Sequence, residues 1–300
     1  MSPKNRVERK RGNRLGFWFF RTAARLFGLR GAYGLLYFVS LYYLLFDRPV
    51  VAAGMAYVKR RFPGHGGLRQ RLDVYQLFLS QGESLIDRYY VALGGSDINL
   101  EFVGYEKIQD VLADGQKGLI LLTAHVGNWQ VAMTALRKLD RTVYLMMRPE
   151  DNAAVKDALN IDSDQDKIRI LYTDGALGGV VDALKAISEG GIVSIMGDRT
   201  YGYASVEASL LGGQVRFPYG AFSLAAAARC PVAVLLSAKV GKKRYVTDVS
   251  HVIDPPAGRR GRKDAEIAAC VQEFAHILEE FADRYPYQWF VFRDMWHGNN

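Results

Sequence analysis

The sequence predicts an α/β fold with a mixed, largely parallel sheet that is flanked by helices. From Gly118 onward, short apolar strands alternate with helical segments, and this alternation is typical of a sheet covered on both faces. Hydrophobic residues make up 49% of the chain and charged residues 23%, which is ample for a packed core. The length of 300 residues suits one large domain, or one domain with an N-terminal addition.

The elements of this body follow one another in a regular order. Strands are expected at residues 118–123, 142–147, 168–173 and 191–197. Helices are expected to follow the first three strands at 128–139, 151–160 and 178–189, and a long loop to follow the fourth. A small-residue helix at 219–230, two strands joined at Lys242-Lys243 and a helix at 264–284 complete the body. In such sheets, sites gather beyond the carboxyl ends of the strands.

The N-terminal part of the chain has a different composition. Residues 1–14 contain six basic side chains and one acid, and Gly31–Phe46 is a run of 16 residues without charge. A spanning helix needs about 20 apolar residues, and basic residues flank this run on both sides. We therefore expect a helix that lies in, or dips into, the cytoplasmic leaflet of a membrane. A single-pass membrane span and an ordinary buried core helix are the alternatives.

A soft boundary is expected near residue 95. Residues 68–93 are expected to form one or two amphipathic helices that stop at Gly94-Gly95, and residues 98–108 alternate like an edge strand. The chain is thus divided into an N-terminal membrane-associating segment, 1–95, and an α/β body, 96–300.

The net charge of +8 favours anionic partners, such as nucleic acid, anionic lipid or a phosphorylated carrier. The chain has no interleaved aromatic and basic recognition motif, and its basic excess is concentrated near the apolar run, so nucleic acid is not expected. The two cysteines lie in apolar settings without metal-binding spacing, and no metal is expected.

The stretch "LILLTAHVGNWQ", residues 119–130, carries the strongest indication of chemistry. A strand of aliphatic residues leads directly into His125, Gly127 and Asn128. Asn128 is well placed to cap the following helix, which leaves the imidazole of His125 at the carboxyl end of a strand. A histidine there is a sensible general base for a hydroxyl nucleophile. A lone loop histidine with a structural hydrogen bond is the alternative.

An ordered series of motifs resembles the lysophospholipid acyltransferase superfamily, in its lipid A lauroyl/myristoyl acyltransferase branch. "AHVGNWQ" resembles the family's HxGNWE block, and "MMRPEDN" its strand that ends in Arg-Pro, here Arg148 and Pro149. "SIMGDR" resembles its Asp-Gln block with Asp198, and "YPYQWFVF" its closing Pro-x-Gln-Trp. The resemblance covers residues from about 15 to 296.

This resemblance implies a glycerol-3-phosphate acyltransferase-like fold and O-acyl transfer at the cytoplasmic face of the cell inner membrane. The donor would be a thioester of acyl carrier protein or coenzyme A, without a further cofactor, and the acceptor a lipid A precursor or related anionic lipid. His125 would be the general base. Gly127, Asn128, Arg148, Asp198 and Arg199 would bind substrate. Basic residues at 258–263 and at Lys242, Lys243 and Arg244 would suit an acidic carrier protein or a phosphorylated lipid.

The chain departs from the family at position 130. The family pairs its histidine with an acid in a His-x4-Asp/Glu dyad, and this chain has Gln130 at the position of the acid. A glutamine can hold the tautomer of His125, but it cannot neutralise the imidazolium, unless Asp198 or Glu150 takes that part. Two alternatives follow: an acyltransferase for a different lipid or small-molecule acceptor, and a catalytically weak, lipid-binding homologue.

Overall fold

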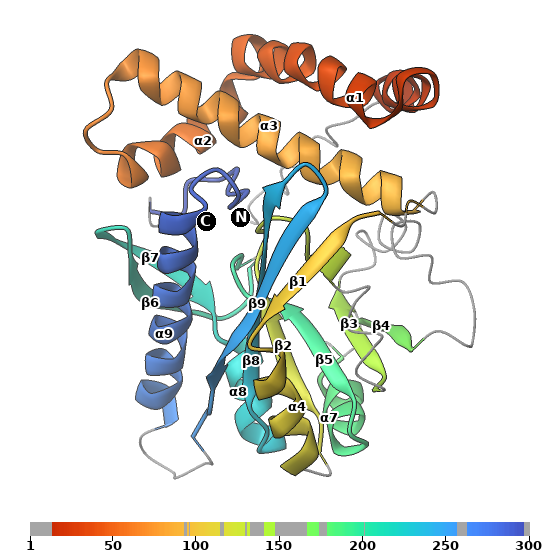
Figure 1. The fold of residues 1–300 in the computed structure, drawn as a ribbon. Helices are drawn as coiled ribbons and strands as arrows, with labels where there is room; N and C mark the ends of the chain where they lie inside the picture. Colours follow the sequence, from red (N-terminus) through yellow and green to blue (C-terminus); the bar gives the residue numbers. More distant parts are fainter. Residues whose placement is uncertain are drawn as a thin grey trace, which may run out of the picture.

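A computed structural model gives the fold of the chain (Figure 1). It describes residues 14–92, 95, 97–114, 117–129, 131–132, 141–147, 167–173, 179–200, 202–256 and 263–296; the side chains of 14–27, 92, 114 and 263 are not part of this description. The predicted helix at 151–160 lies outside these residues, as does most of the helix predicted at 128–139.

Seven strands in the described part of the chain form one sheet, in the order β1-β9-β8-β2-β5-β3-β4 (Figure 1). The strands are β1 Asn99–Val103, β2 Leu119–Thr123, β3 Val143–Met147, β4 Ile168–Tyr172, β5 Ile192–Met196, β8 Val232–Gly241 and β9 Arg244–Ile253. β2, β3, β4, β5 and β8 are parallel, β9 is antiparallel to β8, and β1 is parallel to β9. The predicted mixed, largely parallel sheet is confirmed.

Helices cover both faces of the sheet, and β2 shows why its sequence is purely apolar. Ile120 and Leu122 of β2 belong to a core shared with α7, α8 and α9, whereas Leu119 and Leu121 belong to a second core shared with α4. Because neighbouring residues of a strand point to opposite faces, a strand covered on both sides must be apolar at every position. The helices are α4 Tyr105–Asp114, α7 Val180–Ser188, α8 Gly220–Ala228 and α9 Lys263–Arg284.

Two local predictions were wrong. The edge strand predicted for 98–108 ends at Val103, because Gly104 adopts a φ of 76° and helix α4 begins at Tyr105. The long loop predicted after β5 contains an antiparallel hairpin, β6 Ser205–Leu210 and β7 Gly213–Pro218, whose turn residues Leu211 and Gly212 both have positive φ. Two-residue turns with positive φ match the twist of a hairpin and are usually marked by Asn-Gly, Asp-Gly or Gly-Gly. The sequence signal for this turn was weak because Leu211 occupies its first position.

Three helices precede the sheet: α1 Arg14–Phe46, α2 Arg48–Arg61 and α3 Gly67–Ala92. α1 is kinked at Gly28, where φ is 64°. Its second half packs closely on α3, since a Cβ atom at Gly82 would lie 2.1 Å from a methyl carbon of Leu36. Within the described residues, Gly28–Phe46 is the one helix long and apolar enough to cross a membrane, by length and composition.

The second half of α1 has two contrasting sides. Ala32 and Leu36 are buried against α3, and Ser40 is buried as well. The other side exposes a row of large apolar residues, which are 45–74% exposed: Tyr37, Phe38, Leu41, Tyr42, Leu45 and Phe46. Helix α3 lies between α1 and the sheet, across the end of the sheet where β8 and β9 turn (Figure 1).

Candidate active site

His125 and Asp198 occupy the carboxyl ends of two neighbouring parallel strands. His125 lies two residues after the end of β2, and Asp198 two residues after the end of β5. The two chain segments are held together beyond the strands, because the amide of Gly197 donates to the carbonyl of Thr123 at 2.8 Å. The parallel sheet thus brings together two residues that are 73 positions apart.

The two side chains form a hydrogen-bonded pair. Nδ1 of His125 lies 2.7 Å from Oδ1 of Asp198, and the amide of His125 donates to Oδ2 at 3.0 Å. The side chain of Asp198 is 1% exposed and that of His125 is 22% exposed. The carboxylate is therefore enclosed, while part of the imidazole can be reached from outside.

Asp198 is ionised and fixes the tautomer of His125. Burial by itself would raise the pKa of the Asp198 carboxyl, but His125, through its charge and hydrogen bonds, and nearby Arg199 outweigh it, so the pKa lies well below its usual range. An ionised carboxylate only accepts hydrogen bonds. The proton of a neutral His125 therefore sits on Nδ1, which leaves Nε2 with a free lone pair, as a general base requires.

A C-terminal segment clamps the histidine loop. The amide of Phe290 donates to the carbonyl of His125 and the amide of Gly127 donates to the carbonyl of Gln288, both at 2.8 Å. Val126 and Trp289 form a β-bridge between these bonds. The indole Nε1 of Trp289 also donates to Oδ2 of Asp198 at 3.2 Å. We call Gln288–Phe290 the clamp, because it holds both partners of the pair.

Only glycine fits at position 127. Gly127 has a φ of 48°, and a Cβ atom there would lie 1.7 Å from the carbonyl oxygen of Ser237 on β8. The left-handed conformation alone disfavours other residues, and the close approach of β8 excludes them. The loop can therefore pass between β8 and the clamp only because it has no side chain at this point.

Asn128 caps the next helix, as the sequence predicts. Its Oδ1 accepts from the amide of Val131 at 3.3 Å, and its Nδ2 donates to the carbonyl of Ser84 on α3 at 3.0 Å. Asn128 is 4% exposed. This side chain therefore joins the histidine loop to the N-terminal helices, and its placement favours a structural part rather than direct contact with substrate.

The remaining predicted site residues are placed as follows. Gln130 and Arg148 lie outside the described residues, and so does Glu150. Arg199 is half-buried, and its guanidinium donates to the carbonyl of Phe290 at 3.0 Å, so it supports the clamp. No group of three or more His, Cys, Asp and Glu residues that could hold a metal ion occurs within the described part of the chain.

Two backbone amides of the loop are already engaged. The amide of His125 donates to Asp198 and that of Gly127 to Gln288. Neither points to an oxyanion in this arrangement. Stabilisation of a negatively charged intermediate is thus left to other donors. Arg148, which the resemblance predicts to bind substrate, has a guanidinium group suited to this part.

Sequence reasoning noted Gln288 and Trp289 as motif residues but gave neither a part in the site. A signal for such a part was present in the sequence, because the polar stretch "YPYQ" separates the last helix from the apolar run "WFVF". What the sequence could not indicate is that this segment adds a strand-like edge to a loop more than 160 residues earlier.

The sequence of the chain was compared with models of known protein families. The family model of bacterial lipid A biosynthesis acyltransferases matches residues 95–297. This region contains both members of the His125–Asp198 pair, the whole sheet and the clamp. The chain belongs to this family. No curated protein matched the chain in a direct search.

Membership of this lipid A acyltransferase family confirms the resemblance predicted from the motifs. The family assigns a general activity to the chain, which is the transfer of an acyl group from a donor to a lipid acceptor. The matched region begins after α3, so the three N-terminal helices lie outside it.

Proposed function

We propose that this protein is an O-acyltransferase that moves a fatty acyl chain from a thioester to a hydroxyl of a lipid A precursor or related anionic lipid. The thioester would belong to acyl carrier protein or coenzyme A. The observation that carries the proposal is the enclosed His125–Asp198 pair at the carboxyl edge of the parallel strands. A buried carboxylate that holds a partly exposed histidine is the arrangement that activates a hydroxyl nucleophile.

The reaction follows from the tautomer. Nε2 of His125 accepts the proton of the acceptor hydroxyl while its oxygen attacks the thioester carbonyl. The imidazolium that forms keeps its Nδ1–H bond to Asp198, whose charge stabilises it. When the tetrahedral intermediate collapses, the carbon–sulfur bond breaks, an ester remains, and His125 returns its proton to the departing thiolate. The enzyme ends in its starting state, without a covalent acyl-enzyme.

Asp198 takes the place of the acid that the family has at position 130. A carboxylate that is 1% exposed and 2.7 Å from Nδ1 supplies both orientation and charge. The imidazolium is then neutralised by Asp198, and no carboxylate is needed at position 130. This assignment revises the sequence-based one, which gave Asp198 a substrate-binding part and named the dyad role as an alternative.

The protein attaches to the cytoplasmic face of the inner membrane through the exposed row of α1, as an in-plane helix. The opposite side of this helix is bound to the body, where Tyr33 donates to the buried Asp87 and Tyr75 donates to the carbonyl of Tyr37 at 3.0 Å. A helix that makes polar contacts with the protein along one side cannot be surrounded by lipid. Its aromatic and leucine side chains suit the interface between headgroups and acyl chains.

The proposal is tested by following a radiolabelled acyl chain. Membranes with and without the protein are supplied with labelled acyl carrier protein thioester, and in parallel with the coenzyme A thioester, together with the total lipid of the host. The expected product is a labelled anionic glycolipid that releases its label in mild alkali, as an oxygen ester does. If neither thioester yields a labelled lipid that depends on the protein, the enzymatic proposal is wrong and a lipid-binding homologue is the better account.

The in-plane helix gives a second prediction. Replacement of Leu45, which is 61% exposed, by serine is expected to weaken binding to anionic vesicles about 10-fold, because the transfer of a leucine side chain into lipid is lost. Flotation with phosphatidylglycerol-containing vesicles measures this binding. Val181→Ser is the matched control, since Val181 is an apolar side chain of similar exposure, 56%, that lies on α7 and not in the row of α1. Equal binding of both variants would contradict attachment through this row.

A further inference from the structure

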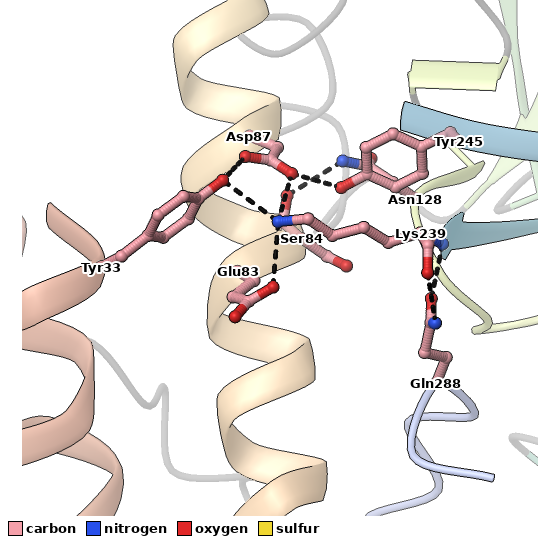
Figure 2. A network of polar contacts seen from close by, with 8 residues as sticks. All are labelled: Tyr33, Glu83, Ser84, Asp87, Asn128, Lys239, Tyr245 and Gln288. Atoms are coloured by element: carbon pink, nitrogen blue, oxygen red, sulfur yellow. Dashed lines mark hydrogen bonds and ion pairs between the residues drawn. The ribbon is translucent and has the colours of Figure 1, made fainter. Parts of the chain in front are cut away.

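A cluster of charged side chains lies where the N-terminal helices meet the sheet, and its central members, Lys239 and Asp87, are buried (Figure 2). Nζ of Lys239 on β8 lies 2.9 Å from both Glu83 Oε2 and Asp87 Oδ2 on α3. Asp87 is 0% exposed, and the side chain of Lys239 is 11% exposed. Ion pairs of this kind are costly to bury, and their geometry must be well maintained.

Two tyrosines complete the cluster. Tyr245 on β9, which faces Lys239 across the hairpin, donates to Oδ2 of Asp87 at 2.5 Å. Tyr33 on α1 donates to the other oxygen of Asp87, accepts from Nζ of Lys239 at 3.1 Å, and places its ring 4.6 Å from that ammonium. Asp87 is thus contacted from α1, β8 and β9, and it ties the proposed membrane helix to the sheet.

The backbone of Lys239 continues this connection toward the active site. Its amide donates to Oε1 of Gln288 at 2.7 Å, and its carbonyl accepts from Nε2 of the same side chain at 2.8 Å. Gln288 begins the clamp that accepts from the amide of Gly127. Figure 2 shows Gln288 turned toward the backbone at Lys239, on the side opposite Tyr33.

A second contact reaches the same loop from α3. Nδ2 of Asn128 donates to the carbonyl of Ser84, which lies between Glu83 and Asp87 in the sequence. One turn of α3 therefore touches the histidine loop directly through Asn128, and indirectly through Lys239 and the clamp (Figure 2). Two separate attachments restrict the loop more strongly than either would alone.

We infer that Lys239 is a positioning residue for His125, and that α3 and the proposed membrane helix α1 are parts of the active-site structure. The inference rests on the proposed function, since it assigns the cluster to the acyl transfer catalysed through His125. Lys239 touches no reacting group. It acts by holding α3, α1 and the clamp in one arrangement, in which His125 meets Asp198 and the acceptor hydroxyl.

The test is a Lys239→Met variant, which keeps the length of the side chain and removes its charge. A catalytic group displaced by about 1 Å can lose about 10²-fold in rate, so we expect kcat to fall by about 10- to 100-fold. The KM for the thioester should change by less than about 2-fold, because the donor contacts themselves are kept. Lys239→Arg, which keeps the charge, should recover part of kcat.

Lys185→Met is the matched control. Lys185 also pairs with an acid, Glu189, but it lies on α7 and both side chains are at the surface. Hydrogen exchange supplies a readout that does not depend on turnover: the amides of Gly127 and Phe290, which carry the clamp, should exchange faster in Lys239→Met than in Lys185→Met. If the wild type transfers no acyl chain, the proposed function fails, while this exchange comparison still decides the inference.

A milder variant keeps the test decisive if Lys239→Met does not fold. Tyr33→Phe removes only the hydroxyl that contacts Asp87 and Lys239, and a loss of about 5-fold in kcat is expected, equivalent to one ordinary hydrogen bond. Tyr105→Phe, at the start of α4 with its ring against Phe102, lies outside the cluster and should not change kcat. The inference is overturned if the cluster variants keep wild-type kcat, or if they lose kcat without faster exchange of the two clamp amides.

Discussion

An Asp198→Asn protein is expected to fold and to lose about 10³- to 10⁴-fold in kcat, as happens when the triad aspartate of a serine protease is replaced by asparagine. The asparagine removes the charge that stabilises the imidazolium. Its amide group can also donate to Nδ1 of His125, which would move the imidazole proton to Nε2 and remove the base. The measurement is single-turnover transfer of a labelled acyl chain from the thioester.

Asp73 offers a matched control for this change. It is also 1% exposed, it lies 2.7 Å from Nδ1 of a histidine, His65, and it accepts from Tyr287 at 2.8 Å. Asp73→Asn therefore removes an equally buried carboxylate from a His–Asp pair outside the proposed site. We expect it to lower stability but to change kcat by less than about 10-fold. Comparable losses of kcat in both variants would mean that Asp198 acts through stability alone.

A double substitution separates a catalytic unit from two independent residues. His125→Ala removes the base and should reduce transfer to background. Adding Asp198→Asn to His125→Ala should cost almost nothing further, because residues that act as a unit show strongly non-additive effects. A further large loss in the double variant would contradict the pairing as the source of activity.

Gln130 distinguishes this account from that of a catalytically weak homologue. If Asp198 supplies the carboxylate, Gln130→Glu has little left to restore and should change kcat by less than about 10-fold. If the chain is limited by its glutamine, the same variant should gain activity from a very low level. If Asp198 supplies the carboxylate, Asp198→Asn therefore lowers kcat strongly and Gln130→Glu barely changes it. If the chain is limited by its glutamine, Gln130→Glu raises kcat.

The ionised state of Asp198 also predicts how stability depends on pH. Its pKa in the folded protein lies below its value in the unfolded chain, because interactions with His125 outweigh the effect of burial. The stabilisation is therefore complete above the unfolded pKa of about 3.9 and is lost as the pH falls further toward the folded pKa. Acid unfolding of Asp198→Asn, followed by circular dichroism, should be less steep in this range than that of the wild type.

The fold was largely predictable because its signals are local. The buried strands are apolar at every position, as in β2, and the helices between them end at glycines or polar residues. Prediction failed where a short element depends on backbone conformation, as at Gly104 and in the β6–β7 turn at Leu211. Positive φ at a leucine is set by the hairpin around it, and no composition signal marks it in advance.

The site was predictable only in part. His125 could be found because it follows a strand of aliphatic residues and precedes a helix cap. Its pairing with Asp198 depends on which strands are neighbours in the sheet, and β2 lies beside β5 rather than beside β3, the next strand in the sequence. The clamp and Lys239 depend on contacts over still longer separations. A lysine within the apolar strand β8 was a usable signal, because buried lysines are rare unless they are paired.

A Gly127→Ala protein is expected to lose more than about 100-fold in kcat and about 2 to 4 kcal/mol in the free energy of unfolding. The added Cβ atom would lie 1.7 Å from the carbonyl oxygen of Ser237, at a φ of 48°. Since β8 is a central strand, the loop must move instead of the strand. Its hydrogen bond to Gln288 would then break, and His125 would leave its place beside Asp198. Urea unfolding and single-turnover transfer measure the two effects.

Gly212→Ala separates conformational strain from displacement of the loop. Gly212 has a φ of 69° in the β6–β7 turn, but a Cβ atom there would meet nothing within 4 Å. This variant should cost about 1 kcal/mol, the ordinary penalty of a left-handed residue, and should keep wild-type kcat. The larger effects of Gly127→Ala would then come from the contact with β8. If both variants kept full activity, the close passage of the histidine loop between β8 and the clamp could not be a requirement for catalysis.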